Sequence, residues 1–516
     1  MAFIRYKTTK KGRKYAMEVE SYWDKEKKQP RQRVVRYLGT VTEEGIKRRR
    51  PQAIPRMALD YGDVKVLENF AEHLKLKQIL EATIGPENAQ LVLGLAMNKL
   101  IRETSYSNYH RWYEGSYIQK MLPFENPSSQ NISRVLERVG LDERAIWSFF
   151  ERWNNTIGIS NTMMYDISTF ASYSEMISFV EYGRDYQDTG LKQVNLGLVC
   201  APDSGLPSYF KLYPGSIADV VTLGQVVDDL KYFGVKKNLY VLDRGFFSAK
   251  NIVNLLKQGD EFIIPLPAGT IQHNAIIAKH RAKAELPEHG SMLNKKVIFH
   301  IEGMTEIDGV SVKYVHYYDP ERKARELENL YRRISKVEEE LEGKPLIGGK
   351  PREMLVSTAG DLASCFSVSI VDGRIHLKRK KNAIARRVNK LGKMILLYNG
   401  SMDWETVLTT YRSKDRIEKM FSELKTDLSA MPLRVHKEST LKGAIFVSFI
   451  ALILYSHLLR RMKEANLSQH YSADGLLLEL AKIKMIEMTA SKSTLSEISK
   501  KCRIILERLG INFDSA

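Results

Sequence analysis

Two aspartates stand at the ends of short apolar segments that predict β-strands. Asp166 ends the segment MMYD, and Asp243 ends the segment LYVLD. In sheets flanked by helices, catalytic groups collect at strand ends, because rigid backbone holds them at an open crevice. A lone aspartate there more often caps a helix or forms a turn, but two on separate strands of a basic chain strengthen the case for catalysis. Carboxylate oxygens suit magnesium or manganese, so the chemistry they indicate is metal-assisted.

A third carboxylate lies on a predicted helix that spans residues 411–425. Lys414, Glu418 and Lys425 follow Tyr411 by three, seven and fourteen residues. At ~100° per residue the four side chains lie within about 60° of one another, on one face of the helix. From this geometry alone, a solvated helix with an ion pair between Lys414 and Glu418 is the simpler interpretation.

The same helix resembles the signature of one group of mobile-element enzymes. In insertion-sequence DDE transposases of the YREK group, part of the insertion-sequence-four superfamily, Y-x-x-R-x-x-x-E is followed after six residues by K. Tyr411, Glu418 and Lys425 match at that spacing. Lys414 stands where the signature has arginine, which is a departure from the pattern, although arginines lie on either side of it.

The resemblance extends beyond this helix. Asp166 in MMYDIST resembles the first aspartate of these enzymes, and Asp243 in LYVLDRGFFS resembles the second. RVVRYLGT near the N-terminus and MPLRVHKESTLKGAIFVSFIALIL after the signature are similar as well, so the likeness reaches most of the chain. It implies an RNase H-like catalytic core in which Asp166, Asp243 and Glu418 bind two divalent ions, Mg²⁺ or Mn²⁺.

Such a site would do phosphodiester chemistry. Cleavage needs a water or a 3′-hydroxyl that is activated near neutral pH, and it needs the charge on the scissile phosphate to be stabilised. Two metal ions ~3.5–4 Å apart do both in an in-line displacement. The ions are also required because carboxylates and phosphate repel each other without them.

The signature and the charge pattern also predict which residues contact DNA. We expect Lys414 and Lys425 to hold phosphates beside the cut, and Tyr411 to stack or hydrogen-bond on the same strand. A second basic segment, 374–393, has nine Lys/Arg and no acid. The predicted DNA-binding residues are Tyr411, Lys414, Lys425, Arg412, Arg416, Arg244, Lys378, Arg379, Lys380 and Lys381.

The composition agrees with an anionic partner. The 516 residues include 79 Lys/Arg against 61 Asp/Glu, a formal net charge of +18. That excess favours nucleic acid first and an anionic membrane second. The three cysteines lie far apart, so neither a zinc knuckle nor a disulfide framework is expected. The longest apolar run, 445–455, is shorter than the ~20 residues that cross a membrane, and it predicts a buried helix.

The fold class expected is α/β. Residues 162–270 predict three strands, a helix, a strand, a helix and a strand, which favours a mixed sheet flanked by helices. A strand at 393–398 and one long helix from Met402 through Leu428 follow later in the chain. We interpret 161–270 and 393–465 as two parts of one RNase H-like catalytic core.

Four further segments complete the expected organisation. Residues 1–50 contain 16 Lys/Arg and 6 Asp/Glu, in a pattern typical of a two- or three-stranded sheet that either contacts DNA or is simply solvated. The four segments are a basic N-terminal β module at 1–55, a helical DNA-binding domain at 56–160, an insertion domain at 271–392 and a C-terminal helical region at 466–516.

The function predicted is cut-and-paste transposition, by two-metal cleavage and strand transfer of transposon-end DNA. An RNase H-like nuclease that cuts without strand transfer would use the same triad. A non-catalytic DNA-binding relative is the third alternative, and the intact triad counts against it.

The expected partners are duplex DNA with terminal inverted repeats, target DNA and a second copy of the chain in the end complex, with no membrane. The N-terminus has no apolar signal sequence, so we expect a cytoplasmic, nucleoid-associated protein. Whether a DNA hairpin forms is left open. If one does, an aromatic of the insertion could hold a flipped base, the candidates being Tyr314, Tyr317, Tyr318 and Phe299.

Overall fold

The fold is taken from a computed structural model. It describes residues 2–10, 12–43, 45–47, 54–158, 160–183, 190–235, 238–281, 283–346, 350–426, 428, 435–489 and 492–513.

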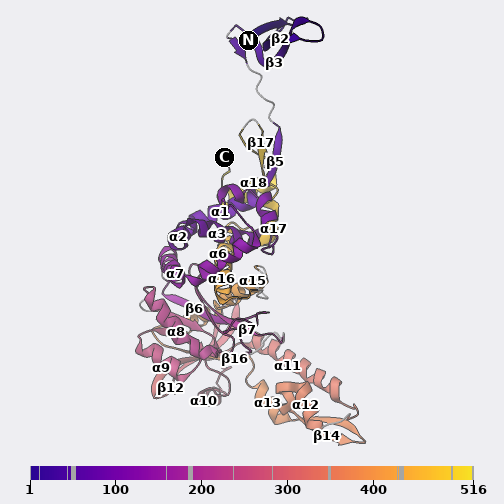
Figure 1. Ribbon diagram of the computed structural model, residues 1–516. Coiled ribbons are helices and arrows are strands. Elements are labelled where there is room, and N and C mark those ends of the chain that lie inside the picture. The colour runs from indigo at the N-terminus through magenta and orange to yellow at the C-terminus, as the bar shows by residue number, and fades with distance from the viewer. Residues whose placement is uncertain are drawn as a thin grey trace.

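A nine-stranded mixed sheet forms the centre of the chain (Figure 1). Its strand order is β11-β12-β13-β16-β10-β9-β6-β7-β8. β6, β7 and β8 form an antiparallel meander, whereas β9 and β10 run parallel to β6 because helices α8 and α9 carry the chain back between them. The strands are β6 (Thr162–Ala171), β7 (Gln193–Ala201), β8 (Leu206–Pro214), β9 (Leu239–Leu242), β10 (Glu261–Pro265), β11 (Gly290–Leu293), β12 (Lys296–Ile307), β13 (Val310–Tyr318) and β16 (Lys393–Tyr398).

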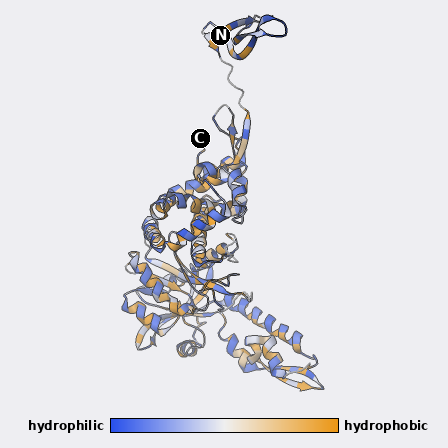
Figure 2. Cartoon of the chain, in the orientation of Figure 1, coloured by the Kyte–Doolittle hydropathy of each residue, from blue (hydrophilic) through white to orange (hydrophobic). Residues whose placement is uncertain are grey.

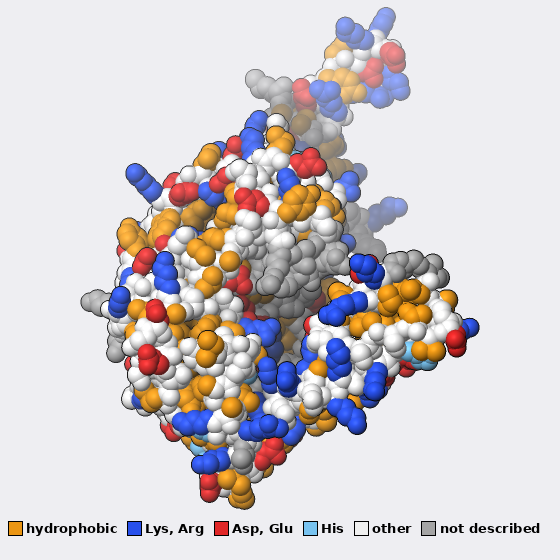
Figure 3. Space-filling view, turned by 90° about the horizontal axis from the view of Figure 1, so that it is seen from below, with side chains coloured by type: hydrophobic (Ala, Val, Ile, Leu, Met, Phe, Trp, Pro, Cys, Tyr) orange, Lys and Arg blue, Asp and Glu red, His pale blue; other side chains and the backbone are white. Residues whose placement is uncertain are grey.

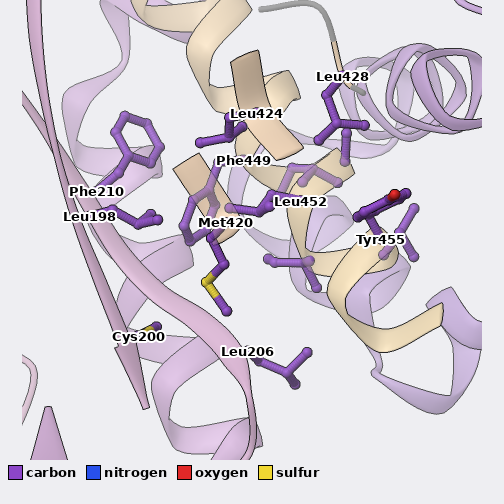
Figure 4. Close-up of a cluster of buried hydrophobic side chains, with 14 of the residues drawn as sticks. Leu198, Cys200, Leu206, Phe210, Met420, Leu424, Leu428, Phe449, Leu452 and Tyr455 are labelled. Atoms are coloured by element: carbon purple, nitrogen blue, oxygen red, sulfur yellow. The ribbon is translucent and has the colours of Figure 1, made fainter. Parts of the chain in front are cut away.

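Helices cover both faces of this sheet, which confirms the α/β prediction. Tyr165 of β6 donates a hydrogen bond of 2.9 Å to Thr222 of α8, on one face. Side chains alternate between faces along a strand, so Asp166 lies on the other face, as does its register partner Leu198. Figure 4 shows Leu198 beside Leu424 of α15. The helices are α8 (Asp219–Tyr232), α9 (Ala249–Lys257), α10 (Ile271–His280), α14 (Trp404–Arg412), α15 (Asp415–Lys425) and α16 (Glu438–Glu464).

A helical body lies beside the sheet and joins distant parts of the chain. β5 (Pro55–Asp60) pairs with β17 (Lys484–Met488), which pairs with β18 (Thr494–Leu495), so residues expected in separate regions share one small sheet. The helices are α1 (Gly62–His73), α2 (Leu76–Ile84), α3 (Pro86–Ile101), α4 (Tyr109–Gly115), α5 (Ile118–Met121), α6 (Ser129–Leu141), α7 (Glu143–Ile157), α17 (Ala473–Leu480) and α18 (Lys500–Leu509).

Helix α16 passes through this body and connects it to the sheet. Within the described part of the chain, α16 alone is long and apolar enough to cross a membrane, and 94 % of its most apolar window is buried inside the fold. The prediction of a buried helix at 445–455 is therefore confirmed.

The crossing of α6 and α16 depends on two glycines. A Cβ atom added at Gly140 would overlap the carbonyl oxygen of Ser439, and one added at Gly443 would overlap the carbonyl oxygen of Leu136. The two backbones therefore approach more closely than any larger residue permits.

The chain between β10 and β16 divides into two parts. β13 pairs with β16, so β11–β13 extend the central sheet, and part of the expected insertion at 271–392 belongs to it. Residues 320–388, which we call the insertion lobe, have their own apolar core, which includes Ile334, Phe366 and Ile375. Its elements are α11 (Pro320–Leu341), α12 (Pro351–Ala359), a 3₁₀ turn (Gly360–Cys365), β14 (Phe366–Val371), β15 (Arg374–Arg379) and α13 (Lys381–Val388). Figure 2 shows that α11 is largely hydrophilic over its length.

The N-terminal sheet has four strands, so the prediction of two or three is wrong. Residues 45–47 add a short fourth strand to β3. The strands are β1 (Ala2–Thr8), β2 (Lys14–Asp24), β3 (Gln29–Thr42) and β4 (Gly45–Lys47). Ion pairs of 2.9 Å between Arg33 and Glu20 and 2.6 Å between Arg36 and Glu18 cross from β3 to β2. Contact between the N-terminal sheet and DNA stays a prediction, and so does the division of the chain into six domains.

We predict that Gly443→Ala destabilises the protein by about 1–3 kcal/mol, because its methyl group would push α16 away from α6. Gly224 in α8 is the matched control, since a Cβ there meets nothing within 4 Å. Gly224→Ala should leave stability unchanged or raise it by about 0.5–1 kcal/mol, because alanine favours a helix. Thermal denaturation followed by circular dichroism measures both. Equal melting temperatures for Gly443→Ala and wild type would contradict the tight crossing.

Candidate active site

The sheet register brings the two predicted aspartates together. β6 and β9 are neighbouring parallel strands, and Tyr165 is the register partner of Leu242. Asp166 follows Tyr165 and Asp243 follows Leu242, so both carboxylates lie at the same end of the sheet. The side chain of Asp166 is 18 % exposed and that of Asp243 is 43 % exposed.

Glu418 approaches this point on α15. The apolar residues Ile417, Met420, Phe421 and Leu424 are buried and hold the helix against the sheet, as Figure 4 shows for Met420 and Leu424. Glu418 follows Ile417 by one residue and lies at the edge of this apolar side, with its side chain 59 % exposed.

The prediction of one long helix from Met402 through Leu428 is wrong. α14 ends at Arg412 and α15 begins at Asp415. Between them the Ser413 hydroxyl donates a hydrogen bond of 2.6 Å to the carbonyl of Thr410, and Lys414 takes the N-cap position of α15. A serine hydroxyl bonded to the preceding turn is a known local competitor of the helical ladder.

Lys414 joins the three carboxylates. Its Nζ atom lies 3.1 Å from Glu418 Oε1, 3.5 Å from Asp166 Oδ2 and 3.9 Å from Asp243 Oδ2. The residue is 4 % exposed. The expected ion pair between Lys414 and Glu418 is present, and the two aspartates complete a cluster of one ammonium and three carboxylates.

Burial and charge act against each other in this cluster. Burial raises the pKa of Asp166 to about 6, although the ammonium of Lys414 acts to lower it. Burial also opposes the charge on Lys414, but the attraction of Asp166, Asp243 and Glu418 outweighs it and raises the pKa of Lys414. Lys414 is therefore charged at neutral pH.

The donor set has the chemistry of a divalent-metal site. It consists of hard carboxylate oxygens from three elements around a single positive charge, which suits Mg²⁺ or Mn²⁺. As the side chains lie, the described residues contain no group of three or more His, Cys, Asp or Glu placed to hold a metal. The ammonium of Lys414 is the cation among these carboxylates.

Comparison with known proteins identifies the family. The family described as "Transposase DDE domain" matches residues 168–454, more than half of the chain. The chain belongs to the DDE transposase family. The match includes Asp243 and Glu418 and begins two residues after Asp166.

Two further comparisons of this transposase were with curated proteins and with solved structures. No curated protein matches it. A solved structure of the piggyBac transposase synaptic complex with hairpin DNA is similar, with 12 % sequence identity, a TM-score of 0.35 and coverage of 84 % of this chain and 82 % of that chain. At that TM-score the likeness carries no conclusion about this transposase.

Three further predicted DNA contacts of this transposase lie on α14 and α15, close in sequence to Glu418: Tyr411, Arg412 and Arg416. Tyr411 is half-buried, and burial together with the charge of Asp243 raises its pKa to about 12. Arg412 lies 3.5 Å from Asp319, and Arg416 is exposed but donates to the carbonyl of Pro202. The expectation of an exposed cation at position 414 is wrong, because the attraction of the two aspartates draws Lys414 inward.

Two more predicted DNA contacts are close in sequence to the triad. Lys425 ends α15 and is half-buried, with its Nζ atom 5.3 Å from the centre of the Phe170 ring. Arg244 follows Asp243 in a short 3₁₀ turn, Arg244–Phe246, and is exposed. Their contact with DNA stays a prediction.

The predicted basic residues at 378–381 belong to the insertion lobe. Lys378, Lys380 and Lys381 are exposed, whereas Arg379 makes a two-point hydrogen bond of 2.7 and 2.6 Å to Glu338 of α11. Arg379 therefore has a partner within the protein, and the three lysines are the better candidates for phosphate contact.

A cavity of about 340 Å³ adjoins the triad and contains cations that the sequence interpretation missed. Arg322 and Arg325 of α11 and Lys296 of β12 line it, together with Tyr411, Lys414 and Glu418. The signal available in the sequence is the run PERKAR at 320–325. Its proximity to the triad depends on where α11 leaves the sheet.

The candidate flipped-base aromatics lie largely inside the sheet. Tyr314, Tyr317 and Tyr318 are each 5 % exposed or less, and Phe299 is half-buried. Tyr317 lines the cavity beside the triad, and its hydroxyl donates a hydrogen bond of 2.5 Å to the carbonyl of Trp404.

We predict that Lys414→Ala lowers the stability of the transposase. Loss of one partner of a fully buried ion pair costs about 3–5 kcal/mol, and the partial exposure of Asp243 and Glu418 reduces this to about 1–3 kcal/mol. Because the pKa of Asp166 is raised to about 6, the cost of its charge is absent at low pH and appears as the pH rises through 6.

The loss caused by Lys414→Ala should therefore be larger at pH 8 than at pH 5 in thermal denaturation without metal. Lys419→Ala removes an exposed lysine from the same helix and is the control, with no expected change. A loss that is the same at both pH values would argue that Lys414 acts by packing alone.

Proposed function

We propose that this transposase carries out cut-and-paste DNA transposition by cleaving and joining transposon ends at Asp166, Asp243 and Glu418. The observation that carries the proposal is the convergence of these carboxylates, from β6, the end of β9 and α15, on one point within 3.9 Å of a single cation. Three such residues, separated by many residues in sequence, meet in a chain that belongs to the DDE transposase family.

Asp166, Asp243 and Glu418 would hold two divalent ions, Mg²⁺ or Mn²⁺. When bound, such ions activate the attacking oxygen and neutralise charge on the scissile phosphate. The protein itself supplies rigid placement, because Asp166 and Asp243 are set by strand pairing and Glu418 by a helix packed on the sheet.

Cations and an aromatic beside the triad would position the DNA strand. Arg322 and Arg325 line the adjoining cavity with Tyr411, and guanidinium groups bind phosphate through two parallel hydrogen bonds. Each contact with phosphate would orient the scissile bond without reading sequence.

A longer DNA path fits the basic surface. Figure 3 shows a hollow between the main body and a smaller lobe, with Lys and Arg side chains along both sides of it. We propose that duplex DNA lies there, with Lys378, Lys380 and Lys381 of the insertion lobe as phosphate contacts. The N-terminal module is proposed as a further DNA contact.

The finer assignment of the family is part of the proposal. Tyr411, Glu418 and Lys425 at signature spacing support the YREK group, and the strands β6–β10 with β16 are proposed as the RNase H-like core. Terminal inverted repeats, target DNA, a second copy of the chain in the end complex and a nucleoid-associated location follow from that assignment.

We predict that Asp166→Asn, Asp243→Asn or Glu418→Gln each abolishes cleavage while leaving DNA-end binding largely intact, because each replacement removes a charge and keeps the shape. Cleavage and joining are followed with Mg²⁺ on DNA that contains the sequences flanking the coding region, and binding is followed by mobility shift. Cleavage that survives any one replacement would remove that residue from the triad. Cleavage without joining by the wild type would favour a nuclease.

We predict that reversing Lys378 and Lys380 to Glu weakens the salt dependence of duplex binding. Each phosphate contact contributes ~0.9 to the slope of log affinity against log salt, so two lost contacts lower it by roughly 2. Arg332 and Lys336, which are exposed on α11 but have helical partners in Glu328 and Glu340, receive the same charge change as the control. An unchanged slope for the first variant would move the DNA path elsewhere.

A further inference from the structure

Lys414 is an unusual lysine. Lysine is almost never fully buried unless it is paired, because its ammonium is strongly hydrated. Here the residue is 4 % exposed, and all three charged groups within ion-pair distance of its Nζ are the carboxylates of the proposed triad. Among the described residues, the charged partners of this buried cation are therefore the groups that a divalent ion would need.

No other cation takes this position among the ion pairs of the described residues. Asp166, Asp243 and Glu418 are each paired with Lys414 and with no second lysine or arginine there. Lys425 is also half-buried near Asp166, but its ammonium lies over the ring of Phe170. Lys414 therefore neutralises the cluster almost alone.

The surroundings of Lys414 offer its ammonium a second location. The residue lies at the junction of α14 and α15, and it lines the cavity that also contains Arg322 and Arg325. A phosphate group in this cavity would be held by Arg325, and by Arg322 in exchange for its ion pair of 2.7 Å with Glu326, and would be a new anionic partner for Lys414. A rotation of the lysine side chain can exchange one partner for the other, since its four-carbon stem is flexible.

We propose that Lys414 is an internal counter-ion that competes with divalent cations for Asp166, Asp243 and Glu418, and that DNA phosphate in the adjoining cavity releases the triad for metal. The inference rests on the proposed function of this site and adds its regulation. Two cations cannot share the same carboxylate oxygens at these distances without strong repulsion, so metal entry requires the ammonium to leave. By linkage, DNA then strengthens metal binding and metal strengthens DNA binding by the same factor.

The consequence is a transposase that binds catalytic metal weakly until DNA is present. Cleavage would then be confined to assembled complexes. The family signature has arginine at this position, and an arginine would keep the positive charge but present a planar, wider group to the carboxylates. The lysine of this chain reaches three carboxylates as a point charge.

Mn²⁺ titration of the DNA-free, full-length protein at pH 8, read by electron paramagnetic resonance, tests the first half. Lys414→Gln should bind Mn²⁺ roughly 5- to 150-fold more tightly than wild type, the usual range of coupling between two ligands. Asp166→Asn subtracts binding outside the triad. Lys419→Gln is the matched control, because it removes an exposed lysine from the same helix that has no ion pair to the triad among the described residues, and its affinity should equal that of wild type.

Lys414→Gln affinity equal to or weaker than that of wild type would overturn the proposal. An equal gain in Lys419→Gln would also overturn it, because a general change in charge would then explain the effect. Lys414→Arg keeps the cation and should stay within a few-fold of wild type. Circular dichroism establishes that each variant is folded before titration.

A second measurement uses the wild-type protein and so does not depend on the folding of any variant. Mn²⁺ affinity is compared with and without a saturating short duplex, and the same complex of Asp166→Asn is subtracted to remove Mn²⁺ bound to DNA. Duplex should increase wild-type affinity and leave Lys414→Gln nearly unchanged. Equal wild-type affinity in both conditions would overturn the release by DNA. Both titrations measure metal and not cleavage, so failure of the proposed function in the cleavage assay is a separate result.

Discussion

Asp166, Asp243 and Glu418 repel one another wherever the fold brings them together, and the ammonium of Lys414 offsets that repulsion. This interaction needs three elements in register at once: β6, the end of β9 and the start of α15. Their placement in turn depends on the central sheet and on the apolar side of α15, where Met420 and Leu424 pack. The central sheet and α15 thus set the positions of these four polar side chains.

The three carboxylate side chains of the cluster differ in how far they are exposed to solvent. The exposed fraction of the carboxylate side chains rises from 18 % at Asp166 to 43 % at Asp243 and 59 % at Glu418. Of the three carboxylates, Glu418 is the one that lines the cavity with Arg322 and Arg325. An anionic strand and a metal ion would therefore approach from the same side, which connects the electrostatics of the cluster to the proposed order of binding.

Local patterns in the sequence predicted the elements better than their pairing. The apolar runs at 162–166 and 239–243 predicted the strands that carry the aspartates, and the run at 445–455 predicted the buried helix α16. The break between α14 and α15 was missed, because both helices keep the same helical spacing and only the hydroxyl of Ser413 marks the turn. The pairing of β13 with β16 depends on hydrogen bonds between residues 75 to 85 apart in sequence, from Tyr318 with Lys393 to Lys313 with Tyr398, which no local pattern contains.

Residue types and spacing by themselves predicted the class of chemistry, from carboxylates at two strand ends, a glutamate on a helix and an excess of positive charge. The same residues carried the resemblance to DDE transposases, the family to which the chain belongs. Only the tertiary structure decided which charges face one another. Lys414 was expected to pair with Glu418 on a solvated helix or to hold a phosphate beside the cut, yet its environment is set by Asp166 and Asp243, which come from distant strands. Electrostatic attraction acts through space, so the sequence identifies the ion while the fold determines its partners.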